Sequence, residues 1–126
     1  MQEVVIAGAA RTAMGGFQGV FNTVSAAQLG GAAIRAALAD AGANTVDELL
    51  MGCVLPAGQG QAPARQAGFA GGLGEEVPAT TLNKMCGSGM KATMIAFDQI
   101  ALGHAQTMIA GGMESMSNAP YLLPAM

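Results

Sequence analysis

Charged and aromatic residues are scarce in this sequence of 126 residues. Only 10% of the residues are charged, 4% are aromatic, and tryptophan is absent. Five basic residues stand against eight acidic ones, which gives a net charge of −3. A nucleic-acid binder needs a cluster of Lys and Arg to contact phosphates, so that class of partner is disfavoured. So few charged side chains cannot make the whole surface of the chain polar. We therefore expect other protein to cover part of it.

Long apolar runs and targeting signals are also missing. The longest apolar stretches are interrupted well before the ~20 residues of a spanning helix, so we expect no membrane association. The N-terminus has neither a basic segment nor a cleavable apolar segment, and we predict a cytoplasmic protein. Two cysteines and one histidine make neither a disulfide framework nor a four-ligand zinc site. We therefore expect no metal and no cofactor.

Apolar residues, glycine and methionine are what the sequence has in excess. The hydrophobic fraction is 52%, with 19 glycines and 10 methionines. This composition excludes disorder and suits one domain or a piece of a larger one. Glycine at this level without a repeat indicates many tight turns and close backbone contacts.

Strand and helix patterns alternate along the chain. Apolar runs predict strands over residues 4–7, 49–55, 77–82 and 107–110. Helices are expected over residues 26–41, from residue 63 to the glycines at 71 and 72, and over residues 89–102. Ser25 and Gln28 have the capping-box spacing before the first helix, and Gly42 is a natural stop after it. The alternation predicts an α/β fold with a mostly parallel sheet and right-handed crossovers.

Two of these elements are predicted to be fully buried. The run 4–7 is apolar throughout, which suits a strand that is covered on both faces. The helix 89–102 is apolar on nearly every face, and such a helix normally lies between two layers.

Cys86 is the strongest candidate for chemistry. It follows a predicted strand and stands at a predicted helix N-terminus, where unpaired N–H groups and the helix dipole favour the thiolate, the reactive form of cysteine. Gly87 and Gly89 allow close approach of a substrate, and the N–H groups, including that of Cys86, can hold an oxyanion. The position alone indicates either an activated nucleophile for acyl transfer or an inert buried cysteine.

Three segments resemble one family. Residues 82–92, Leu-Asn-Lys-Met-Cys-Gly-Ser-Gly-Met-Lys-Ala, are similar to the nucleophile motif of the thiolases, the acetyl-CoA acetyltransferase and 3-ketoacyl-CoA thiolase family. Residues 5–12 resemble the first strand and Arg-Thr turn of that family, and residues 111–118 resemble its Gly-Gly-Met-Glu-Ser-Met-Ser loop. Ala13 and Thr93 depart from it, replacing a usual proline and a usual aliphatic residue.

The resemblance implies a fold and a domain organisation. Thiolases have a layered α–β–α–β–α core built from two similar halves. On this basis residues 1–126 are an incomplete N-terminal thiolase domain that holds most of the N-terminal half. The core βαβ units would span residues 1–112, and residues 113–126 would start the loop region. The whole protein would be a homodimer or homotetramer.

The resemblance also implies a reaction. The enzyme would condense two acyl-CoA molecules, such as acetyl-CoA, to a 3-ketoacyl-CoA, or cleave that product by thiolysis, as in fatty acid metabolism. Cys86 would carry the acyl group as a thioester. The histidine of the family's Gly-His-Pro motif, its Asn-Glu-Ala-Phe segment and the second cysteine of its Cys-Gly-Gly motif are absent here. We therefore expect an inactive N-terminal fragment; the alternative is a non-catalytic thiolase-like binding or assembly module.

Other candidate residues are given structural roles. His104 lies about eighteen residues from Cys86, more than ~20 Å along a helix, and is interpreted as a polar cap near a helix C-terminus. Cys53 is predicted to be core. Glu114 is interpreted as mainly structural, although in thiolases that loop lies near the active site and the subunit contact. Met113 and Met116 are interpreted as packing residues, the alternative being that they line the acyl pocket.

Overall fold

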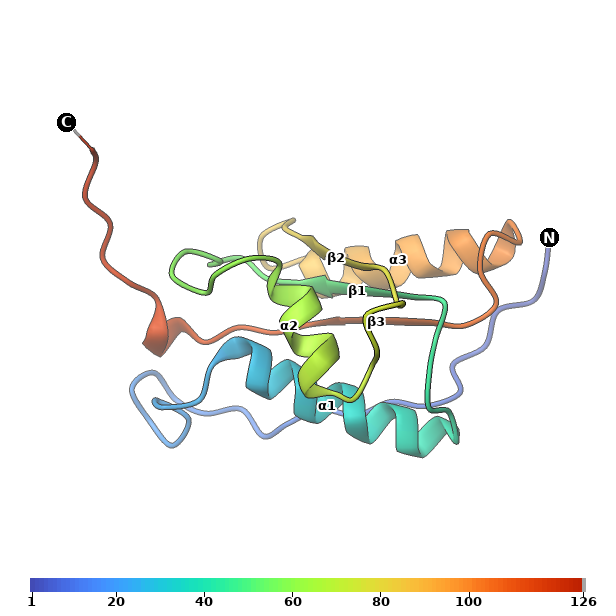
Figure 1. Ribbon diagram of the computed structural model, residues 1–126, viewed down its shortest axis with the longest axis horizontal. Coiled ribbons are helices and arrows are strands. Elements are labelled where there is room, and N and C mark those ends of the chain that lie inside the picture. The colour runs from blue at the N-terminus through green and yellow to red at the C-terminus, as the bar shows by residue number, and fades with distance from the viewer. Residues whose placement is uncertain (126) are drawn as a thin grey trace.

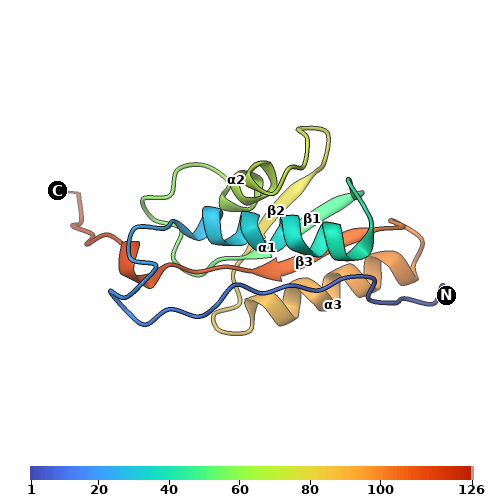
Figure 2. The ribbon, with the colours of Figure 1, turned by 90° about the horizontal axis from the view of Figure 1, so that it is seen from below.

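The computed structural model describes residues 1–125 and shows a parallel sheet between two layers of helices (Figures 1 and 2). The strands are β1 (Glu48–Gly52), β2 (Ala79–Leu82) and β3 (Met108–Gly112), in the order β2-β1-β3. The helices are α1 (Ala26–Ala41), α2 (Pro63–Ala70), α3 (Ser88–Ala101) and the 3-10 turn η1 (Met116–Asn118). Helices α1 and α2 cover one face and α3 covers the other. The predicted α/β class with a parallel sheet is confirmed.

Helix α1 begins and ends where its capping residues predict. The Ser25 Oγ accepts a hydrogen bond from the Gln28 N–H at 3.1 Å, and the Gln28 Oε1 accepts one from the Ser25 N–H at 2.9 Å. Gly42 follows the last turn with a left-handed φ of 68°, which glycine adopts without strain. The prediction for residues 26–41 is confirmed at both ends.

Strand β1 separates two apolar cores. Leu49, Met51 and Cys53 pack with α1 and α2 and are at most 2% exposed. Leu50 points the other way and packs against Ala92 and Ala96 of α3. This alternation is the period of two that a strand imposes on its side chains. Since both faces of β1 are covered, its carboxyl end is held in place from both sides.

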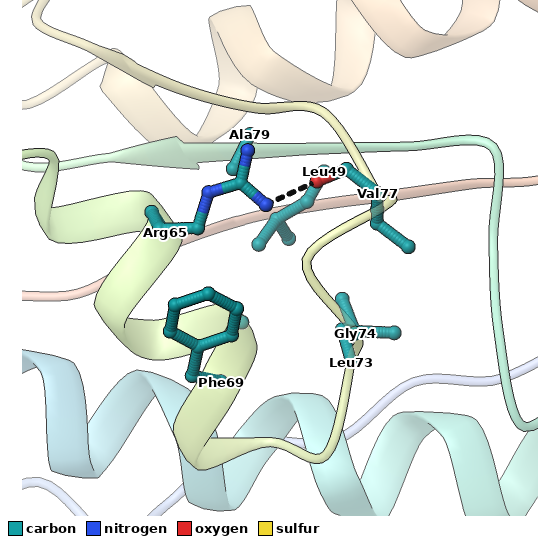
Figure 3. Close-up of a pocket in the computed structure, with 8 residues that line it drawn as sticks. Leu49, Arg65, Phe69, Leu73, Gly74, Val77 and Ala79 are labelled. Atoms are coloured by element: carbon teal, nitrogen blue, oxygen red, sulfur yellow. Dashed lines mark hydrogen bonds between the residues drawn. The ribbon is translucent and has the colours of Figure 1, made fainter.

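Arg65 joins α2 to the connection that leads into β2 (Figure 3). Its Nη1 donates hydrogen bonds to the Val77 carbonyl oxygen at 2.7 Å and to the Glu75 carbonyl oxygen at 3.1 Å. The guanidinium also lies 5.6 Å from the centre of the Phe69 ring, within cation–π range. These contacts fix the start of the strand that precedes Cys86.

The predicted first strand does not form among the described residues. Residues 4–7 are irregular, and Val5 and Ile6 are 71% and 83% exposed. A strand needs a neighbour for its backbone groups, and no described strand pairs with this run. The segment is held instead by two hydrogen bonds. The Gln2 N–H donates to the Ala101 carbonyl, and the Ala9 N–H donates to the Asp40 carboxylate. The expectation of a strand buried on both faces is therefore wrong here.

Helix α3 is buried on one face only. Ala92, Ala96 and Ala101 are buried against the sheet side, whereas Met90 and Phe97 are 73% and 53% exposed. The expectation of burial on all sides is wrong in this structure, because the described residues supply a layer on one side of the helix alone. The exposed face is apolar, as expected for a surface that other protein covers.

Strand ends differ from the predictions by up to three residues. The predicted strand 49–55 stops at Gly52, since the Val54 and Leu55 N–H groups bind Glu114 in place of a neighbouring strand. The predicted strand 77–82 begins at Ala79, and the predicted strand 107–110 continues to Gly112. Of the two methionines interpreted as packing, Met113 is buried and Met116 is 63% exposed, so the second interpretation is wrong.

No helix among residues 1–125 has the length and apolar character needed to cross a bilayer.

Asp47 connects the residues just before β1 with those just before β3. Its hydrogen bonds indicate that the stability of the fold depends on pH. Its Oδ2 accepts hydrogen bonds from the Gln106 and Thr107 N–H groups at 2.8 and 3.1 Å. These two bonds lower the pKa of Asp47 below its ordinary value of 3.8. Because the pKa is lowered in the folded state, the ionised carboxylate stabilises the fold above pH 3.8, and this contribution is lost as the pH falls through the folded pKa.

We therefore expect Asp47→Ala to be less stable than the unsubstituted protein at neutral pH, with a difference that shrinks in acid. Urea unfolding of both proteins across this range measures the difference. A gap that stays constant from neutral pH to the lowest pH reached would contradict the role given to the ionised carboxylate.

Candidate active site

The candidate site lies where the three parallel strands end. Residues 53–55 follow β1, residues 83–87 follow β2 and residues 113–114 follow β3. Because the strands are parallel, these three segments meet at one edge of the sheet, where open α/β sheets usually bind their ligands. Cys86 is in the second of these segments, as the sequence predicts.

A tight turn presents Cys86 at the N-terminus of α3. Ser88 is buried in this turn, where its Oγ accepts a hydrogen bond from the Lys84 N–H at 2.8 Å and donates one to the Met85 carbonyl at 2.6 Å. Met85 has a left-handed φ of 51°, which is strained for a residue with a side chain. The Cys86 thiol is free and exposed. The alternative of a buried cysteine therefore does not describe this residue.

The backbone N–H of Cys86 is the unused one among residues 84–88. The N–H of Met85 binds the Asn83 Oδ1, that of Gly87 binds the Lys84 carbonyl, and that of Ser88 binds the Met85 carbonyl. The Cys86 N–H donates no hydrogen bond to any residue between 1 and 125. It is therefore a donor available beside the thiol, as needed for an oxyanion that forms at a carbonyl attacked by sulfur.

Gly52 sets how closely α3 approaches β1. A Cβ placed on Gly52 would lie 2.5 Å from the Ser88 Cβ and 2.9 Å from the Ser88 carbonyl carbon. The first turn of α3 therefore rests directly on the last residue of β1. Sequence reasoning missed this glycine, because a small residue inside an apolar run carries no signal about what approaches it.

Asn83 was also missed. Its side chain donates to the Val54 carbonyl at 3.2 Å and accepts from the Met85 N–H at 2.9 Å. An asparagine just after a strand, two residues before the N–H that it binds, is a common turn signal that could have marked it.

Cys53, Glu114 and Gln59 form a second cluster at the same edge. Cys53 is 1% exposed, which confirms the prediction that it is core. Its sulfur accepts a hydrogen bond from the Gln59 Nε2 at 3.3 Å and lies 3.5 Å from a Glu114 carboxylate oxygen, to which it donates. Burial raises the pKa of the Cys53 thiol, the Glu114 carboxylate raises it further, and the hydrogen bond from Gln59 acts in the opposite direction. Cys53 is therefore a protonated, packed thiol at neutral pH.

His104 lies beyond the far end of α3. Its N–H donates to the Gln99 carbonyl at 2.8 Å, and its Nδ1 is 3.2 Å from the Gln99 Oε1. The 14 residues of α3 separate it from the Cys86 turn, on the order of 20 Å at about 1.5 Å per residue. The interpretation as a polar residue near a helix C-terminus is confirmed, and this histidine does not reach the thiol.

A cleft on the described surface does not include Cys86. It lies between the start of α1, the loop 55–59 and the segment 115–119, and its lining is mostly small and polar. Neither Met113 nor Met116 lines it. Within residues 1–125, no group of three or more His, Cys, Asp or Glu side chains is placed to hold a metal ion.

Comparison with known proteins places the whole chain in one family. The sequence profile of the thiolase N-terminal domain matches residues 4–126. The chain belongs to the thiolase family. It is 54% identical over 125 residues to acetyl-CoA acetyltransferase B, mitochondrial, of Xenopus laevis, covering 98% of this chain and 30% of that protein.

Two bacterial acetyl-CoA acetyltransferases are similar to nearly the same degree. The acetyl-CoA acetyltransferase of Rhizobium meliloti is 53% identical over 120 residues, which is 94% of this chain and 30% of the relative. That of Pseudomonas aeruginosa is 52% identical over 126 residues, which is 98% of this chain and 32% of the relative. The chain thus spans about 30% of the length of these relatives, and all three segments that carry the resemblance lie inside the matched region.

The two free thiols of this thiolase domain should differ sharply in reactivity. Cys86 is exposed at the start of α3, whereas Cys53 is buried and its pKa is raised by burial. We expect a thiol reagent such as iodoacetamide to modify one cysteine rapidly in the folded protein and both after unfolding. Peptide mass spectrometry should find the rapid modification on Cys86. Equal rates at the two cysteines in the folded protein would contradict the assigned environments.

Proposed function

We propose that the protein is an acyltransferase of the thiolase type with Cys86 as its acyl-accepting nucleophile. The observation that carries this proposal is an exposed thiol at the N-terminus of α3 whose own N–H group is unused. The names of the relatives support it, since each is an acetyl-CoA acetyltransferase. The chain covers about 30% of the length of those proteins, and the proposal concerns the whole protein.

In the first half-reaction the Cys86 thiolate attacks the carbonyl carbon of an acyl-CoA. The oxyanion that forms accepts a hydrogen bond from the Cys86 N–H and faces the positive end of the α3 dipole. When the tetrahedral intermediate collapses, the bond to the CoA sulfur breaks and the acyl group remains on Cys86 as a thioester. The CoA thiolate leaves and takes up a proton.

In the second half-reaction another acyl-CoA loses a proton from its α-carbon. The resulting carbanion attacks the acyl group on Cys86, the C–S bond breaks, and a 3-ketoacyl-CoA leaves the regenerated thiol. Thiolysis is the reverse. The single histidine of this sequence lies at the far end of α3, so it does not transfer protons at Cys86.

Exchange of CoA tests this proposal. The protein as its gene encodes it is incubated with acetyl-CoA and isotopically labelled CoA. A covalent acyl-enzyme predicts that label appears in acetyl-CoA, because the first half-reaction is reversible by itself. No exchange, with the protein folded, would instead favour a non-catalytic thiolase-like binding or assembly module.

Assembly and location are part of the same proposal. The exposed apolar face of α3, which includes Met90, Met94 and Phe97, supports burial against further protein, in keeping with a homodimer or homotetramer. The Xenopus laevis relatives are named as mitochondrial, whereas the bacterial names give no compartment. A cytoplasmic location stays a prediction, to be tested by cell fractionation.

A further inference from the structure

We propose that Glu114 and Asn83 are positioning residues that hold the Cys86 turn against the carboxyl end of β1. The inference rests on the proposed role of Cys86 and adds the groups that fix its place. Hydrogen bonds run without a break from the Glu114 carboxylate, through the peptide between Val54 and Leu55, to Asn83 and the residue before Cys86.

The first part of the path is the Glu114 carboxylate at the end of β1. The Met113 N–H donates to the Gly52 carbonyl at 2.9 Å, which extends the pairing of β3 with β1 by one residue. Glu114 follows, and its two oxygens accept from the Val54 N–H at 2.8 Å and the Leu55 N–H at 3.0 Å. Both bonds are strengthened by the charge of the acceptor. An amide at this position has one acceptor oxygen and cannot reproduce both.

The second part is a single peptide group that is held from both ends. The Leu55 N–H and the Val54 carbonyl belong to the same planar unit. Glu114 binds its N–H, and the Asn83 Nδ2 donates to its carbonyl oxygen at 3.2 Å. Hydrogen bonds in series polarise one another. The orientation of this peptide therefore depends on Glu114, and the side chain of Asn83 depends on the peptide.

The third part is the Asn83 side chain, whose amide is used on both sides. While its Nδ2 binds the Val54 carbonyl, its Oδ1 accepts from the Met85 N–H at 2.9 Å. Met85 holds the strained left-handed conformation immediately before Cys86. A rotated Asn83 amide would release the Met85 N–H, and the direction of the Cys86 thiol and N–H would change with it.

A merely structural role for Glu114 predicts a different result in the Glu114 variant. The two roles are distinguished by whether Cys53 becomes accessible to a thiol reagent. The Cys53 thiol is buried beside the Glu114 carboxylate, with sulfur and oxygen 3.5 Å apart. If Glu114 only held this loop closed, its loss would expose Cys53. If Glu114 positions the turn, its loss changes the reactivity of Cys86 while Cys53 stays protected.

Two variants interrupt the path at different points. Glu114→Gln removes one of the two acceptor oxygens. Asn83→Asp has the same shape and keeps an oxygen for the Met85 N–H, but it places a second oxygen against the Val54 carbonyl, where a donor is needed. Glu75→Gln is the matched control, since Glu75 is exposed and its carboxylate makes none of these bonds. The rate of alkylation by iodoacetamide is measured against pH in the full protein, with both cysteines followed by peptide mass spectrometry.

The expected result is a change of about 10-fold or more in the Cys86 rate for both variants, the size typical of lost supporting contacts. Cys53 stays unmodified, and Glu75→Gln behaves like the unsubstituted protein. The double variant is no worse than the more affected single variant, because both changes break one path. Unchanged Cys86 rates in both variants, additive effects, or changes that appear only with modification of Cys53 would overturn the inference.

Turnover separates this inference from the proposed function. We expect kcat for acyl transfer to fall between about 10-fold and 100-fold in both variants with KM nearly unchanged. If the unsubstituted protein transfers no acyl group but the alkylation pattern holds, the positioning path stands and the proposed function fails. If it transfers acyl groups and alkylation is the same in every variant, the function stands and the path is refuted.

Discussion

Cys86→Ala is expected to lower the rate of acyl transfer by at least about 10⁴-fold, the largest effect of any single change in this chain. Cys53, the other cysteine at this edge of the sheet, is buried and protonated and cannot replace Cys86 as the acyl acceptor. Loss of a nucleophile removes the covalent intermediate altogether, and what remains is the stabilisation that backbone donors give by themselves. CoA exchange and steady-state turnover measure the loss.

Folding of this variant should be unaffected, because the Cys86 side chain is exposed. Urea unfolding is the control, together with Met14→Ala, which changes a loop side chain that is 84% exposed and lies outside the site. Both variants should unfold at the same urea concentration as the unsubstituted protein. Acyl transfer retained in a folded Cys86→Ala protein would remove Cys86 from the mechanism.

Gly52→Ala is expected to have the second largest effect, on both stability and turnover. The added methyl group would lie 2.5 Å from the Ser88 Cβ and 3.1 Å from the Gly89 backbone nitrogen, and both belong to the first turn of α3. Backbone cannot rotate away as a side chain can, so β1 and α3 must separate. Overpacking of this kind costs about 1–3 kcal/mol of unfolding free energy. A displacement of the Cys86 turn by about 1 Å costs about 100-fold in turnover.

Gly16→Ala is the matched control for this substitution. A Cβ on Gly16 would meet no atom within 4 Å, and its φ does not lie in the left-handed region. We expect its stability to stay within about 0.5 kcal/mol of the unsubstituted protein, as for most surface changes. Urea unfolding and turnover of the two glycine variants should therefore diverge. Equal behaviour would show that the contact between β1 and α3 does not fix the site.

Local signals in the sequence were enough to predict α1, α2 and the Cys86 turn. The capping box of Ser25 and Gln28 acts within four residues, and so the start of the helix is set by local residues. Local patterns also place Cys86, because the end of one predicted strand and the start of the next predicted helix lie on either side of it. Strands β1, β2 and β3 were each predicted, because their short apolar runs alternate with helix patterns and such alternation implies a parallel sheet.

Predictions that depend on neighbours far along the chain were less successful. The run 4–7 and the outer face of α3 are apolar, yet burial depends on what packs against them, and the described residues cover neither. Gly52 and Asn83 act across 36 and 29 residues, on Ser88 and Val54 respectively. Glu114 reaches Val54 over 60 residues. Contacts of this kind follow from the folded topology and have no local pattern.

The most direct test of the account is to identify the residue that carries the acyl group. The protein as its gene encodes it is mixed with acetyl-CoA, quenched in acid, digested and analysed by mass spectrometry. We predict one acetyl group, bound as a thioester on Cys86, which is released by hydroxylamine and by added CoA. Acetylation of another residue, or a folded protein in which Cys86 remains a free thiol after exposure to acetyl-CoA, would contradict it.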